Sequence, residues 1–483
     1  MPLDTAYRGR LAVALTLSVL LQGCQSSPLR SDPVPDIQVR SGVDPQLRLH
    51  NCELPIDQAV DGEYLPLERA VALAVERAPD LQAALARTRL AAAEADQSRK
   101  LPNPVLDFIL RWGPGKPQFE ISFAHAFVQV LQMPRRTSAA DNRLRETAAG
   151  AIATALDVIE ETQTAYAEAR ADAASIPVLE ARLAVARKLE DLARSRVEAG
   201  EATSTDVSIA RSQVSAITVE LESVKRQAEH HRLHLARLVG APSSPTRWRF
   251  STPPTIPESA AESQWISVAL SHQPNILEAR WRLASLEDVA ALAAWSVWEQ
   301  STLGADAQRD DAWFVGPSFS VPIPIFDDGS AARAGATAAA LEARHKLTAA
   351  ARTAIQDVRD AWNSYASVGR GLRTVRDDLL PTQRQRRLLV EESYRAGQLD
   401  ITAVDLAEQD LRAAELQELQ SERDLWIARA KLERAAGGPS IAAGLMKLGT
   451  GPAAATTPCR DNPSAATAMS PAQLPPNMKE ITR

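Results

Sequence analysis

The sequence predicts a mainly α-helical fold with a small β part, built from two copies of one unit that each hold a long helical hairpin and two short strands. Three observations predict this fold. Sequence segments recur at a nearly constant spacing, long stretches carry helical apolar periodicity, and seven of the eight phenylalanines fall in two short windows with strand periodicity.

Length, net charge and cysteine content exclude several classes of function. The 483 residues are enough for about three domains of roughly 150 residues each. The 54 Lys and Arg against 60 Asp and Glu leave a net charge of −6, which argues against nucleic acid as a partner because such binding rests on many cation–phosphate contacts. Three cysteines, Cys24, Cys52 and Cys459, are too few and too widely spaced for a cysteine-ligated zinc site.

The N-terminus has the pattern of a secretory signal. Two arginines, Arg8 and Arg10, precede an apolar run at 11–21 that is too short to span a membrane. The run ends in Leu21-Gln22-Gly23-Cys24, which resembles a bacterial lipobox and implies acylation of Cys24. Gln25, in place of the Asp of inner-membrane lipoproteins, points to an outer-membrane anchor. A merely buried cysteine would leave the small Gly23 unexplained.

The internal repeat has an offset of about 195 to 197 residues. Three matched pairs of segments define it: Ala70–Leu81 with Trp265–Ile276, Val197–Gly200 with Tyr394–Gly397, and Leu238–Pro242 with Ala435–Pro439. The predicted organisation is a signal peptide at 1–23, an anchor segment at 24–62, a first repeat at 63–250, a second repeat at 258–440, and a Pro/Ala-rich tail at 441–483 that is expected to be mostly disordered.

Each repeat contains a long helical stretch, predicted at 139–196 and 331–393, that is rich in Ala, Leu, Glu and Arg. Gly200 and Gly397 end these stretches, and a second helix follows each glycine. The two long helices therefore belong to helical hairpins. Pro177 and Pro381 fall inside them, where a missing N–H donor and a ring clash should bend or break the helix.

Two aromatic windows, 102–133 and 296–326, predict β-hairpins at 104–131 and 301–324. The residues expected on one face are Leu106, Phe108, Leu110, Trp112, Phe119, Ile121, Phe123 and Phe127 in the first window, and Trp313, Val315, Phe319 and Val321 in the second. Soluble hairpins packed on helices would alternate in the same way, but the lipobox favours an outer-membrane barrel. Four strands cannot close a barrel alone, so the barrel should be shared between protomers.

These features together resemble the TolC-like outer membrane efflux proteins over about residues 60–440. The resemblance rests on the duplication, on Pro79-Asp80 and Pro274-Asn275, on the Gly316–Gly329 run with its Pro-Ile-Phe-Asp-x-Gly wording, and on Tyr394-x-x-Gly397. It implies a homotrimeric duct with twelve strands, four per chain, above a helical tube that meets a periplasmic adaptor and an inner-membrane pump. The strand-to-helix run is similar to the heavy-metal branch of the family, although drug-efflux members also carry lipid anchors.

The resemblance also implies site residues. The adaptor-docking turns would contain Val197, Gly200, Thr203, Tyr394 and Gly397. A closed gate would be held by a hydrogen bond from Tyr394 to Asp206 across neighbouring coils, with Asp400 and Asp405 as the nearest substitutes for an acidic constriction ring. The alternative is that Asp206 merely faces solvent.

Other groups of residues give weaker evidence about function. His230, His231 and His234 share a helix face and could hold a metal ion, but a solvated helix face explains them better because no further ligand cluster is apparent, so we expect no metal site. The sequence has no nucleophile motif, phosphate-binding motif or dinucleotide-binding motif, so we expect neither enzymatic activity nor a bound cofactor. Cys52 and Cys459 are a candidate disulfide. The main alternative function is a periplasmic coiled-coil lipoprotein that acts as a tether.

Overall fold

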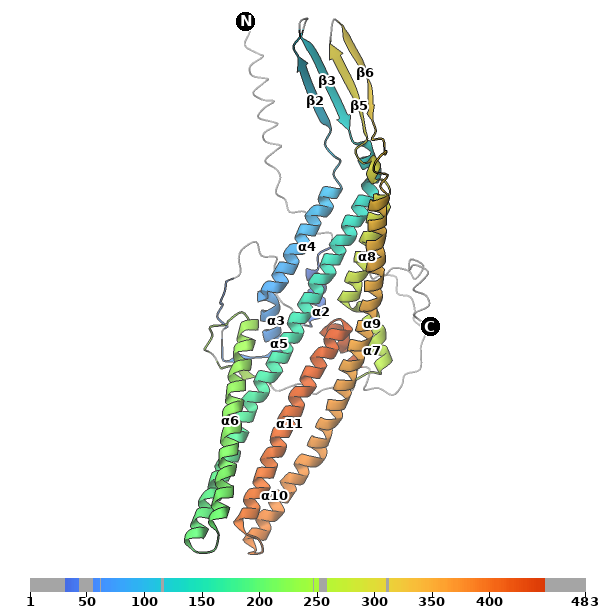
Figure 1. Ribbon diagram of the computed structural model, residues 1–483. Coiled ribbons are helices and arrows are strands. Elements are labelled where there is room, and N and C mark those ends of the chain that lie inside the picture. Colours follow the sequence, from blue (N-terminus) through green and yellow to red (C-terminus); the bar gives the residue numbers. More distant parts are fainter. Residues whose placement is uncertain are drawn as a thin grey trace, which may run out of the picture.

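The computed structural model describes residues 31–42, 55–60, 62–113, 117–245, 247–251, 259–309 and 312–447 (Figure 1). The signal peptide, the lipobox with Cys24, and the candidate disulfide Cys52–Cys459 lie outside these residues. The described chain is an elongated array of helices. One four-stranded sheet lies at one end, and the two turns that join the helices of the hairpins lie at the other. This matches the predicted mainly α fold with a small β part.

The first repeat begins with a two-residue strand and ends with the return helix of its hairpin. Its elements are β1 (Tyr64–Leu65), α3 (Leu67–Arg77), α4 (Pro79–Ser98), β2 (Val105–Arg111), β3 (Gln118–His125), α5 (Phe127–Glu198) and α6 (Ser204–Leu238), followed by β4 (Arg249–Phe250), which pairs in parallel with β1. The α3–α4 junction is at Pro79, which occupies the first turn of α4, where a missing N–H costs nothing.

The second repeat has the same order of elements. It comprises α7 (Glu262–His272), α8 (Pro274–Ala293), the 3₁₀ turn η1 (Ser296–Trp298), β5 (Thr302–Arg309), β6 (Trp313–Ser320), α9 (Ser330–Thr374), the π-helical turn η2 (Val375–Leu379), α10 (Leu380–Arg395) and α11 (Ile401–Ala436). Pro274 starts α8 as Pro79 starts α4. The duplication predicted from the three matched segments is therefore a structural duplication.

The two long helices respond differently to their internal prolines. In the first repeat α5 runs for 72 residues, so of the two effects predicted for Pro177, a bend or a break, the break does not occur. The turns after Pro177 are held by packing, because Leu179 and Leu183 are buried against Ile217 of α6. In the second repeat the π-helical turn η2 directly precedes Leu380 and Pro381, so the helix is interrupted there as predicted.

The four longer strands form one antiparallel sheet in the order β2-β3-β5-β6, with β2 and β6 at its edges. Two boundaries differ from the prediction. The first hairpin was expected to continue through Phe127, but β3 ends at His125 and Phe127 starts α5, from which its ring packs against Phe319 at 5.8 Å between centroids. Likewise β6 ends at Ser320, so Val321 lies beyond the sheet.

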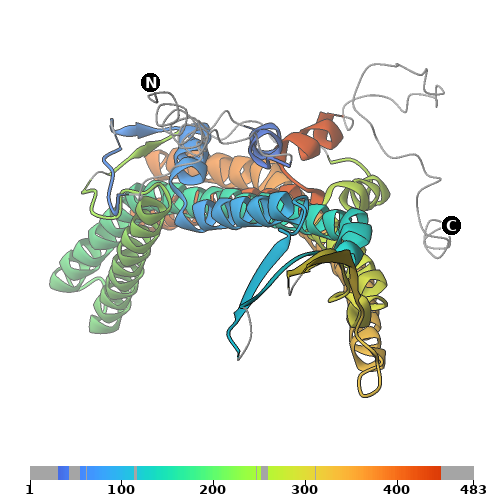
Figure 2. The ribbon, with the colours of Figure 1, turned by 90° about the horizontal axis from the view of Figure 1, so that it is seen from above.

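A group of short elements surrounds the middle of the helices. It consists of α2 (Val34–Ser41), the β1–β4 pair, α7 and α12 (Pro439–Lys447). Seen along the helices, α2, α12 and the β1–β4 pair lie on one side of the helix row and the four-stranded sheet lies on the other (Figure 2). The tail predicted from 441 onward therefore starts as a helix, because Ala442, Leu445 and Met446 are buried in the core of the second repeat.

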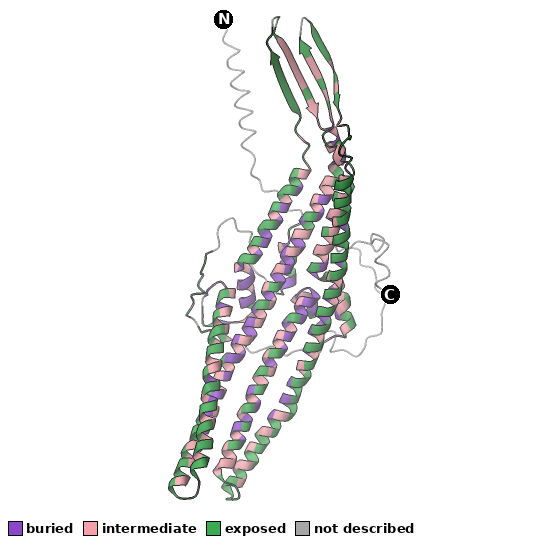
Figure 3. Cartoon of the chain, viewed as in Figure 1, coloured by how far each residue is buried: buried purple, intermediate pink, exposed green. Residues whose placement is uncertain are grey.

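The core follows the middle of the helices, and the strands and the hairpin turns are mostly exposed (Figure 3). Many buried positions of α5 are alanines, which lets neighbouring helices approach closely. The largest fully buried side chains include Trp265, Ile159, Leu179, Leu235 and Leu432. Among the described helices, none combines the length and the apolar composition that crossing a membrane requires.

Candidate functional site

The sheet has one apolar and one polar face. Strand register places the apolar side chains in line across all four strands, so that Phe108 pairs with Ile121, Ile121 with Ala307, and Ala307 with Val315. The apolar side chains on this face are Leu106, Phe108, Leu110, Phe119, Ile121, Phe123, Leu303, Ala305, Ala307, Trp313, Val315 and Phe319. His125, Arg309 and Pro317 share the face by register, and the Arg309 guanidinium lies 5.8 Å from the Trp313 ring centroid. The apolar face and the alternation are as predicted within the strands, whereas Trp112, Phe127 and Val321 lie beyond the strand ends.

The opposite face of the sheet is polar at its centre. Asp107, Ser122 and Asp306 stand opposite one another on three strands, and Ser122 donates a hydrogen bond to Asp107 at 3.4 Å. On the same face Arg111 and Glu120 form an ion pair at 3.0 Å. The apolar side chains of the other face are largely exposed in the single chain, with Val315 75% and Phe108 60% accessible. Such a sheet needs an apolar environment on one face only.

The turn of the first hairpin joins α5 to α6. Gly200 has a φ of +78°, and its N–H donates to the carbonyl oxygen of Val197 at 3.0 Å. Thr203 then caps α6: the carboxylate of Asp206 accepts hydrogen bonds from the backbone N–H of Thr203 at 2.8 Å and from its hydroxyl at 2.9 Å. These bonds hold the pKa of the Asp206 carboxyl below its usual value.

The turn of the second hairpin repeats this geometry. Gly397 has a φ of +72°, and its N–H donates to the carbonyl oxygen of Tyr394 at 2.9 Å. Asp400 caps α11 by accepting from the N–H of Ile401 at 2.7 Å. A Cβ atom at Gly200 or Gly397 would meet no atom within 4 Å, so the two turns have open surroundings in the chain. The glycines are required by backbone conformation alone.

An ion pair joins the two turns. Arg196, in the last turn of α5, contacts the Asp400 carboxylate, and this hydrogen bond lowers the pKa of Asp400. Gln213 of α6 donates to Gln409 of α11 at 2.6 Å further along. The two hairpins are thus linked twice near their ends. Arg196 was not among the predicted site residues, and its signal in the sequence was a basic residue directly before the Val197–Gly200 turn.

The predicted gate residues lie in this region but are not all in contact. Within the described part of this chain no hydrogen bond joins Asp206 to Tyr394, since Asp206 binds Thr203 and the Tyr394 side chain is 42% exposed. Asp405 lies near the start of α11. Burial raises the pKa of its carboxyl, Lys188 of α5 opposes that shift and Glu408 adds to it. The bond expected across neighbouring coils remains a prediction.

The three histidines of α6 do not converge. His231 Nδ1 lies 2.7 Å from the buried Asp172 carboxylate of α5, and His234 Nε2 lies 3.1 Å from Glu161. Their nitrogens therefore face separate carboxylates and pair α6 with α5. No group of three or more ligating side chains able to hold a metal ion is found in the part of the chain that the structure describes.

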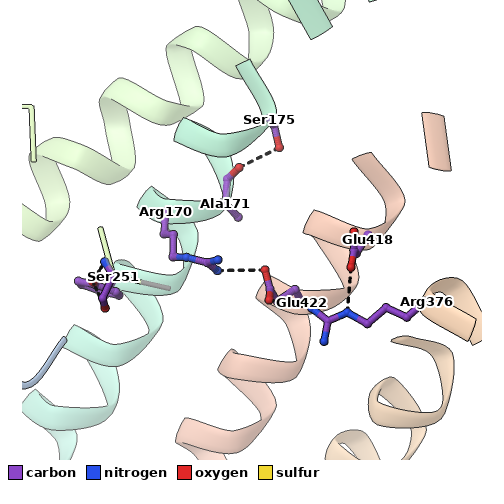
Figure 4. Close-up of polar contacts among 8 residues, drawn as sticks. Arg170, Ala171, Ser175, Ser251, Arg376, Glu418 and Glu422 are labelled. Carbon is purple, nitrogen blue, oxygen red and sulfur yellow. Dashed lines mark hydrogen bonds and ion pairs between the residues drawn. The ribbon is translucent and has the colours of Figure 1, made fainter. Parts of the chain in front are cut away.

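A charged network joins the repeats near the middle of the molecule (Figure 4). Glu422 of α11 accepts hydrogen bonds from Arg170 of α5 at 3.1 Å and from Arg376 of η2 at 3.0 Å. Arg376 also donates to Glu418 at 2.8 Å. The π-helical turn of the second repeat is thereby fixed to the uninterrupted helix of the first through one glutamate.

Comparison with known proteins identifies the family. The outer membrane efflux protein family matches residues 70–241 and 265–438, which are the two structural repeats and more than half of the chain. The chain belongs to this family. Its members are transport proteins of the outer membrane, and the efflux role and outer-membrane location follow for this chain. No curated protein sequence matches it significantly.

Solved structures with the same fold are outer-membrane channels. The outer-membrane channel OprN superimposes with a TM-score of 0.64 at 19% identity, over 82% of this chain and 99% of that one. VceC from Vibrio cholerae gives 0.61 at 19% identity over 77% and 96%, and the Campylobacter jejuni CmeC channel gives 0.63 at 14% over 82% and 94%. At these identities the likeness establishes the fold alone.

Proposed function

We propose that the protein is the passive outer-membrane exit duct of a tripartite efflux system, a homotrimer supplied by an inner-membrane pump through a periplasmic adaptor. The observation that carries the proposal is the four-stranded sheet, with one apolar face and with β2 and β6 at its edges. An open sheet edge leaves backbone groups without partners in lipid. Pairing β6 of each copy with β2 of the next closes a twelve-stranded barrel and removes these edges.

The hairpin turns at the other end fit the docking of an adaptor. Both turns expose a helix end whose backbone is fixed by a glycine in the left-handed region, and their surroundings are open. Val197, Gly200, Thr203, Tyr394 and Gly397 form these turns. In the proposed trimer, Asp206 and Tyr394 of neighbouring copies hold the entrance closed, and Arg196–Asp400 holds the two hairpins of one copy together.

Two further proposals concern residues outside the described chain. Cys24 carries the lipid anchor, and Cys52 pairs with Cys459, the two thiols that remain after acylation. Alkylation of the mature protein without a reductant tests the pair, and two freely alkylated cysteines would exclude it. The cargo, heavy-metal cations or drugs, is set by the partner pump because the duct itself performs no chemistry.

A matched pair of arginine substitutions tests the duct. Val315 lies on the apolar face of β6 and Ser318 on its polar face. An arginine facing lipid at mid-membrane costs about 2–4 kcal/mol per copy, and one facing water costs little. We expect wild type and Ser318→Arg to give trimers in outer-membrane extracts and stepwise currents in planar bilayers, and Val315→Arg to give neither. A wild-type protein that is soluble after removal of the lipid and passes no current would instead support a tethering role.

A further inference from the structure

In each repeat a glycine with positive φ follows the last helix, and an arginine side chain binds a backbone carbonyl beside it. The arginine comes from a different part of the chain in the two repeats. In the first repeat, α6 ends at Leu238, and Gly240, two residues further on, has a φ of +75°. Arg77, the last residue of α3, donates from Nη1 to the carbonyl oxygen of Val239 at 3.1 Å and to that of Gln58 at 3.2 Å. Its side chain fills the space beside the glycine, since a Cβ at Gly240 would lie 2.8 Å from Arg77 Cδ.

The matching position of the second repeat lacks this arginine. The segment that aligns with Glu76-Arg77-Ala78-Pro79 is Ser271-His272-Gln273-Pro274, so His272 stands where the first repeat has Arg77. The second repeat keeps the glycine: Gly437, directly after the end of α11 at Ala436, has a φ of +102° and matches Gly240 of the first repeat. A Cβ at Gly437 would lie 3.0 Å from the His272 carbonyl oxygen. The imidazole of His272 bonds within its own helix, to Ser271 and to the Val268 carbonyl.

Arg40 of α2, which precedes the first repeat, supplies a guanidinium at this place. Its Nη1 donates to the carbonyl oxygen of His272 at 2.7 Å and to that of Gly437 at 3.2 Å. The residue is only 7% exposed, and its Nε lies 3.4 Å from the Asp36 carboxylate on its own helix. One side chain thus joins the end of α7 to the end of α11. A buried carbonyl deprived of this charged donor would be costly.

The backbone near Arg40 is closely packed against neighbouring segments. A Cβ at Gly438 would lie 2.9 Å from the Arg40 carbonyl oxygen, and one at Gly42 would lie 3.3 Å from Pro439 Cβ. The end of α2 is therefore packed against the junction of α11 and α12. Ile37, on the same helix, is 1% exposed and belongs to the core of the first repeat. An eight-residue helix outside both repeats consequently contacts both.

We propose that α2 is a strap that closes the second repeat, with Arg40 as a positioning residue that provides the guanidinium for which the second repeat has only His272. The strap fixes the upper end of α11, and α11 continues without interruption to the second hairpin turn at Asp400. The segment that leads from the N-terminus is in this way part of the mechanical support of the second hairpin. The inference does not depend on the proposed duct function.

Hydrogen exchange of the full-length, detergent-solubilised protein tests the strap. In Arg40→Ala we expect amides in 34–41, 265–273 and 432–447 to exchange at least tenfold faster, with 235–241, which is not in the core cluster of Ile37, unchanged. Arg77→Ala should give the reverse pattern. Val39→Ala is the matched control on α2, because Val39 is 70% exposed and should change neither region. If Arg40→Ala does not yield folded protein, Arg40→Lys, which keeps the charge but not the fork of donors, should show the same pattern more weakly.

A rescue experiment separates the guanidinium from general packing. Adding His272→Arg to Arg40→Ala places an arginine where the first repeat has one, and we expect it to slow exchange in 432–447 at least threefold relative to Arg40→Ala. Unchanged exchange in Arg40→Ala, or an equal increase in both repeats, would overturn the strap. A double variant that exchanges as fast as Arg40→Ala would overturn the role assigned to the missing arginine.

Discussion

Replacing Glu422 by glutamine should destabilise the protein more than the same change one turn away. The Glu422 side chain is 10% exposed and accepts from two arginines, of which Arg170 is 21% and Arg376 46% exposed. A charge-assisted hydrogen bond contributes about 1.5–3 kcal/mol when shielded, and an exposed ion pair about 0.2–1 kcal/mol. We therefore expect Glu422→Gln to lower the free energy of unfolding by about 2–3 kcal/mol.

Glu418→Gln is the control. Glu418 lies one turn from Glu422 on α11, and among the described residues it contacts Arg376 only, which keeps its bond to Glu422 when Glu418 is changed. The expected loss is about 1 kcal/mol or less. Urea unfolding of the purified protein, followed by far-UV circular dichroism at one protein concentration, measures both variants.

Equal losses in the two variants would refute the assignment of Glu422 as the shared acceptor. So would a Glu422→Gln variant within about 0.5 kcal/mol of wild type, since surface substitutions normally fall in that range. Double-mutant cycles with Arg170→Gln and Arg376→Gln then divide the loss between the two arginines.

Four further outcomes are expected. Cys24→Ser should abolish palmitate labelling, and equal labelling would exclude Cys24 as the lipid site. Asp206→Ala combined with Tyr394→Phe should raise single-channel conductance, and an unchanged value in an assembled trimer would assign the closed entrance to other contacts. Gly397→Val should abolish efflux while trimers still form, because a β-branched residue is strained at a φ of +72°; loss of trimers would contradict a docking role. Burial, and after it the nearby Glu146 carboxylate, raises the pKa of Glu278, so the stability of the fold should fall as the pH rises through that pKa. Glu278→Gln should therefore raise the melting temperature at pH 8 but not at pH 4, and equal gains at the two pH values would refute this reasoning.

Local sequence signals predicted the repeated elements and their turns. The glycines at 200 and 397, the prolines that start α4 and α8, and the alternation in the strands each reflect a constraint within a few residues. Periodicity alone could not place the start of α5, because Phe127 is as apolar as a strand residue, and its position depends on packing against Phe319. The short helix α12 was missed because its Pro/Gly-rich start and Ala-rich composition resemble a loose tail.

The contacts that join the repeats could not be predicted from local pattern. Arg196 and Asp400 are 204 residues apart, and Arg40 and Gly437 are 397 apart. Each charge looks like an ordinary surface residue in its own segment, and only the packing of the two hairpins brings the partners together. The candidate turns were therefore predicted, whereas the bonds that hold them in place were not.

The π-helical turn η2 has a consequence for symmetry. A π turn accommodates one residue more than an α turn, so side chains beyond Leu379 are rotated by about 100° around the axis relative to an unbroken helix. The first repeat has no such rotation between the sheet and its turn, because α5 is continuous from Phe127 to Glu198. The offset between matched residues grows from 195 at Pro79 and Pro274 to 197 at Gly200 and Gly397, so the second repeat holds two residues more on this stretch, and a π turn takes up one added residue within a helix. The two outer helices thus reach hairpin turns of the same backbone geometry with different numbers of residues and different local winding.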